Sequence, residues 1–144
     1  MKQTTIFLTG FIAIFIISLT ITTGCSKDKQ ILQDTAWEIE SVKVHTDSIW
    51  QYPEEPICWE DEFVLRFNNR NKFFFVACSG NVRFSTNQKI SFKVSQCLAV
   101  GGYSDLALEC YTMINTQITY YELSEKVFIL KGENGEIINL KKME

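Results

Sequence analysis

Short runs in which apolar and polar residues alternate at every second position are the feature that most constrains this chain. Trp37 and Ile39 alternate with Glu38 and Glu40, and the same period of two returns over residues 63–68. Successive side chains of a β-strand point to opposite faces, so this pattern is typical of strands with one buried face. Turn residues separate most of the runs, and strands and helices do not alternate, which predicts antiparallel pairing.

The pattern predicts about eight strands and one helix. The strands are expected over residues 35–44, 63–67, 72–77, 82–85, 90–94, 118–123, 126–131 and 136–140. Residues 78–81 are expected to form a kink or tight turn. A helix capped by Ser104 or Asp105 should pack one apolar face on the sheet. The expected fold class is α+β, mainly antiparallel β with one packed helix.

Three consecutive phenylalanines occupy positions 73–75. Because side chains alternate along a strand, at least one of these rings must lie on the opposite face of the sheet from its neighbours. Burial beneath the helix is the expected arrangement for this cluster, and an exposed binding patch is the alternative.

The N-terminus has the layout of a bacterial lipoprotein signal. Lys2 precedes an apolar run over residues 6–21, and Gly24-Cys25 follows it. At 1.5 Å per residue a helix over this run would span about 24 Å, less than the ~30 Å hydrocarbon core that an uncleaved anchor must cross. We therefore predict a signal peptide over residues 1–24, a lipid such as palmitate on Cys25, a tether over residues 25–30 and one domain over residues 31–144.

This address and the charge of the chain set its expected location and partners. The mature chain would keep 13 of the 14 Lys and Arg residues and all 17 acidic residues, which gives a formal charge of −4. Nucleic acid is therefore not an expected partner, and an anionic lipid surface should repel the chain weakly. The expected location is the cell envelope, lipid-anchored to the outer membrane on its periplasmic or surface face.

Four further cysteines, Cys58, Cys78, Cys97 and Cys110, remain in the mature chain. No C-x-x-C pair occurs and His45 is the only histidine, so no metal site is expected. In an oxidising envelope these cysteines predict two disulfides, for which three connectivities exist. Cys78 with Cys97 is expected because both lie at strand ends, and Cys58 with Cys110 would then pair by default. Four buried free thiols are the alternative.

The segment from residue 45 to 61 interrupts the strand pattern with both prolines and five carboxylates. It also carries Trp50, Tyr52 and Trp59, which are the candidate binding residues because aromatic side chains dominate binding energy at interfaces. The competing interpretation is that the rings fold back over one open end of the sheet. Neither His45-Thr46-Asp47-Ser48 nor the carboxylates have the spacing of a catalytic triad or a calcium loop. We expect no enzyme, no catalytic residue and no cofactor.

The order of several short motifs resembles the META/HslJ-like domain of bacterial envelope lipoproteins over residues 31–142. The motifs are residues 37–42, residues 63–67, Cys78 followed by Gly80-Asn81, Cys97, a helix with Glu109, and a hairpin over 127–130 and 137–140. The resemblance implies a compact antiparallel sheet with one helix and a role in stress or antibiotic tolerance without known catalysis. A lipocalin-like barrel is the alternative with the same number of strands.

Two classes of function follow from these expectations. The first is a noncatalytic structural or interaction domain that contacts an unknown envelope protein. The second is a lipocalin-like barrel that binds a small apolar ligand. A cavity of several hundred Å³ inside the fold would favour the ligand-binding class, and a filled core would favour the interaction class.

Overall fold

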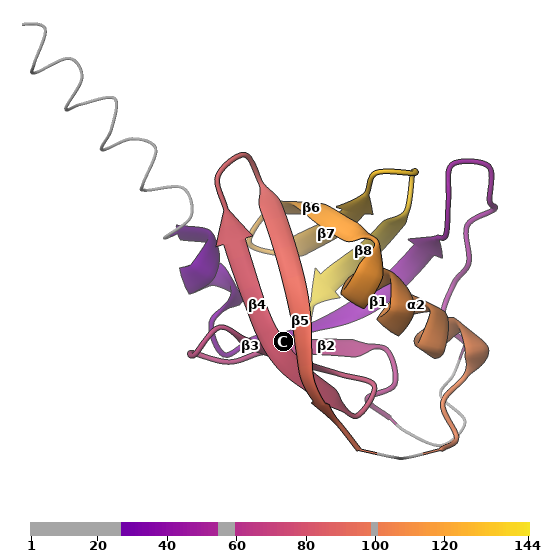
Figure 1. The fold of residues 1–144 in the computed structure, drawn as a ribbon, viewed down its shortest axis with the longest axis horizontal. Coiled ribbons are helices and arrows are strands. Elements are labelled where there is room, and N and C mark those ends of the chain that lie inside the picture. Colours follow the sequence, from indigo (N-terminus) through magenta and orange to yellow (C-terminus); the bar gives the residue numbers. More distant parts are fainter. Residues whose placement is uncertain (1–26, 55–59, 99–100) are drawn as a thin grey trace, which may run out of the picture.

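The computed structural model describes residues 27–54, 60–98 and 101–144, and within them eight antiparallel strands close into a barrel (Figure 1). The strand order is the order in the sequence, and β1 pairs with β8 to close the ring. The elements are β1 (Ala36–Lys43), β2 (Val64–Phe67), β3 (Lys72–Phe75), β4 (Cys78–Ser85), β5 (Lys89–Cys97), α2 (Asp105–Thr116), β6 (Ile118–Leu123), β7 (Val127–Gly132) and β8 (Ile137–Lys142).

The mainly antiparallel β architecture is confirmed, but the sheet closes on itself rather than forming an open α+β layer, and residues 27–32 form a second short helix in addition to the expected α2. Closure rests on the pairing of Ile39 with Leu140 and of Val42 with Ile138, which joins segments about a hundred residues apart. Strand periodicity reports which face of a strand is buried but carries no information on which distant strand is its neighbour. Among the described residues, no helix has the length and hydropathy needed to cross a membrane.

Aromatic rings fill the interior of the barrel. Phe128 is fully buried and makes edge-to-face contacts with Trp37, Phe67 and Tyr121, with ring centroids 5.5, 5.8 and 6.2 Å apart. This geometry is the one that aromatic quadrupoles favour, and the rings interdigitate as in a close-packed core. The inward positions that the alternating pattern assigned to Trp37 and Ile39 are confirmed.

The helix α2 packs beside the least regular seam of the barrel. Strands β5 and β6 share one register pair, Lys89 with Tyr120, whereas β4 and β5 pair along their full length. Ser104 is the N-cap, and its hydroxyl accepts a hydrogen bond from the Ala107 backbone N–H at 3.3 Å. The buried face of α2 therefore joins the barrel core at the place where the strands separate; it consists of Ala107, Cys110, Met113 and Ile114.

One local prediction is wrong. Residues 78–81 are not a turn but the start of β4, because the chain reverses one step earlier, at Val76 and Ala77. Within the tether expected over residues 25–30, the described residues belong to a short helix over residues 27–32. Leu32 is buried in the core, and Asp28 accepts a hydrogen bond from the Tyr121 hydroxyl at 2.6 Å, so this segment is held against the barrel.

Candidate functional site

The predicted binding residues that the structure describes lie at one end of the barrel and are exposed. Trp50 retains 39% of its accessible surface and Tyr52 retains 66%. The loop that carries them is held by Val42 and Gln51, whose backbone groups exchange two hydrogen bonds of 2.8 Å. These two aromatics therefore do not fold back into the core. Trp59, the third candidate, lies outside the described residues, as does the lipidation candidate Cys25.

The expected disulfide between Cys78 and Cys97 is confirmed. The two residues are directly opposite each other on β4 and β5, which brings their sulfurs together at one end of this hairpin. Cys110 is a free, fully buried thiol. The expected disulfide between Cys58 and Cys110 is therefore wrong. Cys58 itself lies outside the described residues.

The position of Cys110 explains why pairing by elimination failed. Its side chain is on the inner face of α2, within the core cluster. Burial away from water, with a smaller contribution from the neighbouring Glu109 carboxylate, raises the pKa of the Cys110 thiol to about 12. A thiol in this setting stays protonated and behaves as a small apolar side chain rather than a nucleophile.

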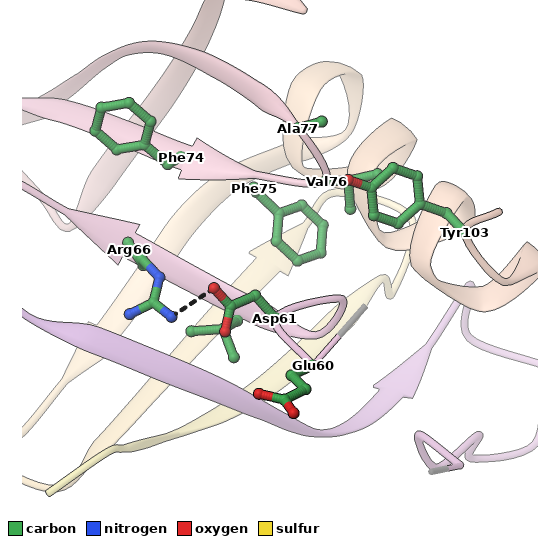
Figure 2. Close-up of a pocket in the computed structure, with 9 residues that line it drawn as sticks. Glu60, Asp61, Arg66, Phe74, Phe75, Val76, Ala77 and Tyr103 are labelled. Atoms are coloured by element: carbon green, nitrogen blue, oxygen red, sulfur yellow. Dashed lines mark ion pairs between the residues drawn. The ribbon is translucent and has the colours of Figure 1, made fainter. Parts of the chain in front are cut away.

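A groove of about 570 Å³ opens on the outer surface of β2 and β3 (Figure 2). The Arg66 guanidinium lies 2.8 Å from the Asp61 carboxylate on one side of it. Phe74 projects outward from β3 and retains 44% of its accessible surface, and Tyr103 lies beyond the end of the strand. The groove also borders Glu60, Val64, Phe75, Val76 and Ala77. It thus combines an ion pair, a further carboxylate and exposed aromatic surface.

Sequence reasoning misplaced the aromatic part of this groove. Phe73 and Phe75 point into the barrel and are buried, whereas Phe74 points outward, away from the core. The expected burial of the whole cluster beneath α2 is therefore wrong for Phe74. The three-phenylalanine run did predict a ring on the second face of the sheet, and an up-and-down barrel leaves that outer face in contact with solvent.

The turn at the rim of the groove has an unusual backbone. Val76 and Ala77 have φ values of 49° and 54°, and they form the two-residue connection between the paired residues Phe75 and Cys78. Two-residue hairpin turns with positive φ at both positions favour Asn and Gly, and a β-branched residue such as Val disfavours this conformation.

The residue that follows β5 is hydrogen-bonded to this turn. Ala77 accepts a backbone hydrogen bond from Leu98 at 3.0 Å, next to the disulfide that ties Cys78 to Cys97. Sequence rules gave no signal for the turn because Val-Ala is not a turn dipeptide. The rim is consequently a fixed part of the groove, anchored both by a hydrogen bond and by a covalent bond.

A second hollow of about 350 Å³ lies near the start of α2, bordered in part by Tyr52, Glu54 and Glu62. Glu62 is only 1% exposed, and its carboxylate accepts a hydrogen bond from the Ser104 backbone N–H. A carboxylate at this place interacts favourably with the unpaired N–H groups of a helix N-terminus. Glu62 therefore has a structural role in attaching α2 to the barrel.

Neither hollow offers a metal centre. Across residues 27–54, 60–98 and 101–144, no group of three or more His, Cys, Asp or Glu side chains is placed to hold a metal ion. The ion pair, the aromatic surface and the rigid rim of the larger groove are instead suited to contact with another molecule's surface.

The fold defines a class, a closed up-and-down antiparallel barrel of eight strands with a helix beside one seam. No protein-family model matches the sequence, and no curated protein matches it. Solved structures that share the fold include the following two. One is an NMR structure of a protein from Burkholderia xenovorans, with a TM-score of 0.55 and 13% identity over 81% of this chain and 87% of that chain.

The other solved structure is a DUF4847 family protein from Bacteroides vulgatus, determined by crystallography. Its TM-score is 0.56, with 12% identity over 81% of this chain and 99% of that chain. At this level of identity the similarity shows a common fold.

Proposed function

We propose that this chain is a noncatalytic envelope lipoprotein, anchored to the outer membrane through a lipid on Cys25, whose barrel binds an envelope protein in the groove beside Phe74. The observation that carries the proposal is the outward placement of Phe74 on β3, next to Arg66 and its ion pair with Asp61, in a groove that Tyr103 borders on the opposite side. Aromatic and Arg side chains are the residues that contribute most to binding at protein interfaces.

The composition of the groove supports a protein partner over a small molecule. Phe74 lies directly opposite Arg66 on the neighbouring strand, so an aromatic ring and a guanidinium form one continuous surface. The rim at Val76 and Ala77 is held in place before any partner arrives, which lowers the entropy that binding must overcome. The exposed rings of Trp50 and Tyr52, at the same end of the barrel, would extend the contact.

The resemblance to META/HslJ-like domains supports an envelope role connected with stress tolerance. Under this proposal the domain acts by recruiting or bracing another envelope component. The apolar run and the Gly24-Cys25 junction support the lipid anchor. Mass spectrometry of the mature N-terminus tests the anchor independently, because Cys25→Ala should accumulate as an unprocessed precursor.

The alternative function is a lipocalin-like barrel that binds a small apolar ligand. Closure of eight antiparallel strands in sequence order favours it, since this architecture can enclose a ligand. The rings around Phe128 oppose it, because they occupy the space that a ligand would need. A ligand could enter only if these rings moved apart.

Site-specific photo-crosslinking in intact cells tests the groove. The full-length chain would carry a photoreactive phenylalanine in place of Phe74, with the same group at the exposed position Lys93 on β5 as the matched control. We expect a discrete adduct from position 74 that Arg66→Glu abolishes without changing the amount of folded protein. Identical adduct patterns from positions 74 and 93, or an adduct that survives Arg66→Glu, would reject the groove as the binding site.

A further inference from the structure

The two ends of the barrel carry opposite charges. We call one end the basic end; it consists of residues 27–34, which are helical over 27–32, the turns 68–71, 86–88 and 124–126 with the strand residues beside them, and the last residues 142–144. These segments lie together because odd-numbered strands begin and even-numbered strands finish at this end (Figure 1, left). The other end carries the long loop after β1, the start of α2 and the turn between β7 and β8.

Exposed cations outnumber anions at the basic end. The cations are Lys27, Lys29, Arg70, Lys72, Lys89, Lys126 and Lys142, and all of them are exposed. The anions are Asp28, Asp34, Glu125 and Glu144. Within the part of the chain that the structure describes, none of these cations forms an ion pair. The basic charge is therefore available to an external partner.

Internal contacts also occupy two of the four anions. The Asp28 carboxylate accepts a hydrogen bond from the Tyr121 hydroxyl at 2.6 Å, and the Asp34 carboxylate accepts one from the Asn69 backbone N–H at 3.1 Å. The acidic residues of the molecule gather instead at the opposite end; they include Asp47, Glu54, Glu60, Asp61, Glu62, Asp105, Glu109, Glu133 and Glu136. The chain therefore has a net negative charge although one of its two ends is basic.

The N-terminal segment joins the barrel at the basic end. Leu32 is buried in the core and Asp28 is bonded to Tyr121, so the helical residues 27–32 cannot swing away from the barrel without breaking these contacts. The apolar run over residues 6–21 precedes them. Only two peptide steps separate Cys25 from Lys27, a reach of about 7 Å in an extended chain. This is within the ~8 Å Debye length at physiological ionic strength.

We propose that the basic end is a docking surface for the anionic phospholipid headgroups of a bilayer, on which the barrel stands with its acidic end directed away. Charge complementarity and the position of the N-terminal segment both select this occupant. The inference requires only that the apolar run is in a membrane, either as the route to a lipidated Cys25 or as a retained anchor. It is independent of the protein-binding groove, which lies toward the other end.

A hollow at the basic end has the chemistry of a headgroup site. It has a volume of about 650 Å³ and lies between the N-terminal helical segment and the end of β8. Lys126 and Lys142 border it together with the apolar side chains of Ile31 and Met143, and Glu125 and Glu144 are also in its lining. Ammonium groups beside apolar surface can contact a phosphate and the start of its acyl chains at the same time.

The net charge predicts weak repulsion between this chain and an anionic bilayer, whereas the distribution of charge over the two ends predicts attraction. Repulsion from the acidic end is screened, because an eight-residue strand such as β4 spans about 26 Å, which separates that end from a bilayer at the basic end by more than one ~8 Å Debye length. Attraction acts at the basic end, where the Lys and Arg side chains lie within one Debye length of the headgroups. Net charge therefore gives the wrong sign for this interaction.

Lysine footprinting of the full-length chain tests the proposal. The protein would be reconstituted in vesicles of neutral phosphatidylcholine, or of phosphatidylcholine with about 30 mol% phosphatidylglycerol, and acylated with a water-soluble amine reagent. We expect Lys29, Lys126 and Lys142 to react about fivefold more slowly in the anionic vesicles, and about 0.5 M NaCl to remove the difference. Lys43 and Lys93, which lie away from the basic end, should react equally in both.

A pair of charge-reversal variants sharpens the test. Lys126→Glu with Lys142→Glu should abolish the slower labelling of Lys29 in anionic vesicles, whereas Lys43→Glu with Lys93→Glu should leave it unchanged. Equal labelling in both kinds of vesicle would overturn the proposal, since the anchor alone would then position the barrel. Protection by inorganic phosphate in neutral vesicles would also overturn it, because the surface would then be selective for a soluble anion.

Discussion

Replacing Phe73 and Phe74 by alanine, one at a time, gives a sharp test of the barrel and of its outer groove. The two residues are adjacent on β3, yet Phe73 is fully buried and Phe74 is 44% exposed. The Phe73 ring packs edge-to-face on Phe92 at a centroid distance of 5.1 Å. It also covers its cross-strand partner Gly80, where an added Cβ would lie 2.8 Å from the ring.

These contacts set the expected magnitudes. Truncation of a buried phenylalanine removes about 3–5 kcal/mol from the free energy of unfolding, so Phe73→Ala should lower it by about 4 kcal/mol. At about 4 °C per kcal/mol for a domain of this size, the melting temperature should fall by about 16 °C. Phe74→Ala removes a ring that is already half in water, so its cost should stay below about 1 kcal/mol.

Urea unfolding of both variants, followed by circular dichroism under oxidising conditions, measures the two costs. Phe74→Ala is the matched control because it makes the same chemical change one residue away. Similar losses of stability in the two variants would refute the assignment of inward and outward faces on β3. The groove beside Phe74 would then have no exposed aromatic surface, and the proposed binding site would fail with it.

Three further predictions follow from the cysteines and the long loop. Loss of the disulfide in Cys78→Ser with Cys97→Ser should lower the free energy of unfolding by about 3 kcal/mol in the chain-entropy model, and a reducing agent should then have no further effect on the melting temperature. Because the folded pKa of Cys110 is raised from 9.0 to about 12, the stability that its buried thiol contributes is complete below pH 9 and is lost as pH rises above that value. Raising the pH from 8 to 10 should therefore lower the free energy of unfolding, measured by urea titration, by about 1 kcal/mol more in the parent chain than in Cys110→Ala. Equal losses in the two chains would contradict the raised pKa. Trp50→Ala should change stability by less than about 1 kcal/mol in a thermal melt, because the ring is partly exposed, and a loss of about 3–5 kcal/mol would instead show that the loop covers the core.

Local patterns in the sequence were sufficient to predict most of the strands. The alternation around Trp37 and Ile39 reports burial of one face, and burial of that face is what holds β1 in the barrel. The cap at Ser104 was also predictable, since a hydroxyl that accepts from the first turn is a local contact. The pairing of Cys78 with Cys97 was predictable because both cysteines lie within one hairpin.

Features that depend on distant contacts could not be predicted in the same way. Val76 and Ala77 adopt positive φ values although neither residue favours them, because the disulfide and the Leu98 hydrogen bond hold the turn from outside. Cys110 is unpaired because it is buried on the inner face of α2, and spacing of cysteines in the sequence does not report that orientation.

The candidate surfaces were only partly predictable for a related reason. Composition indicated Trp50 and Tyr52 as candidate binding residues but left open whether they are exposed or fold back over the end of the sheet, and both are exposed. The groove beside Phe74 requires knowledge that Phe74 on the outer face of β3 is left exposed by the described residues. The basic end requires the strand order, because its cations come from five separate segments that only the closed barrel brings together.

The pairing of β1 with β8 has a consequence for how this protein is made. Synthesis proceeds from the N-terminus, so β1 is made long before β8, and Ile39 has no partner until Leu140 has been added. Until β8 arrives, one side of β1 is a row of unpaired backbone donors and acceptors, which is a template for pairing with other chains. A chain truncated before Ile137 would keep that edge open permanently. The six-residue strand β8 therefore protects the chain from aggregation by pairing with the open edge of β1. Premature termination should yield insoluble protein rather than a slightly smaller barrel.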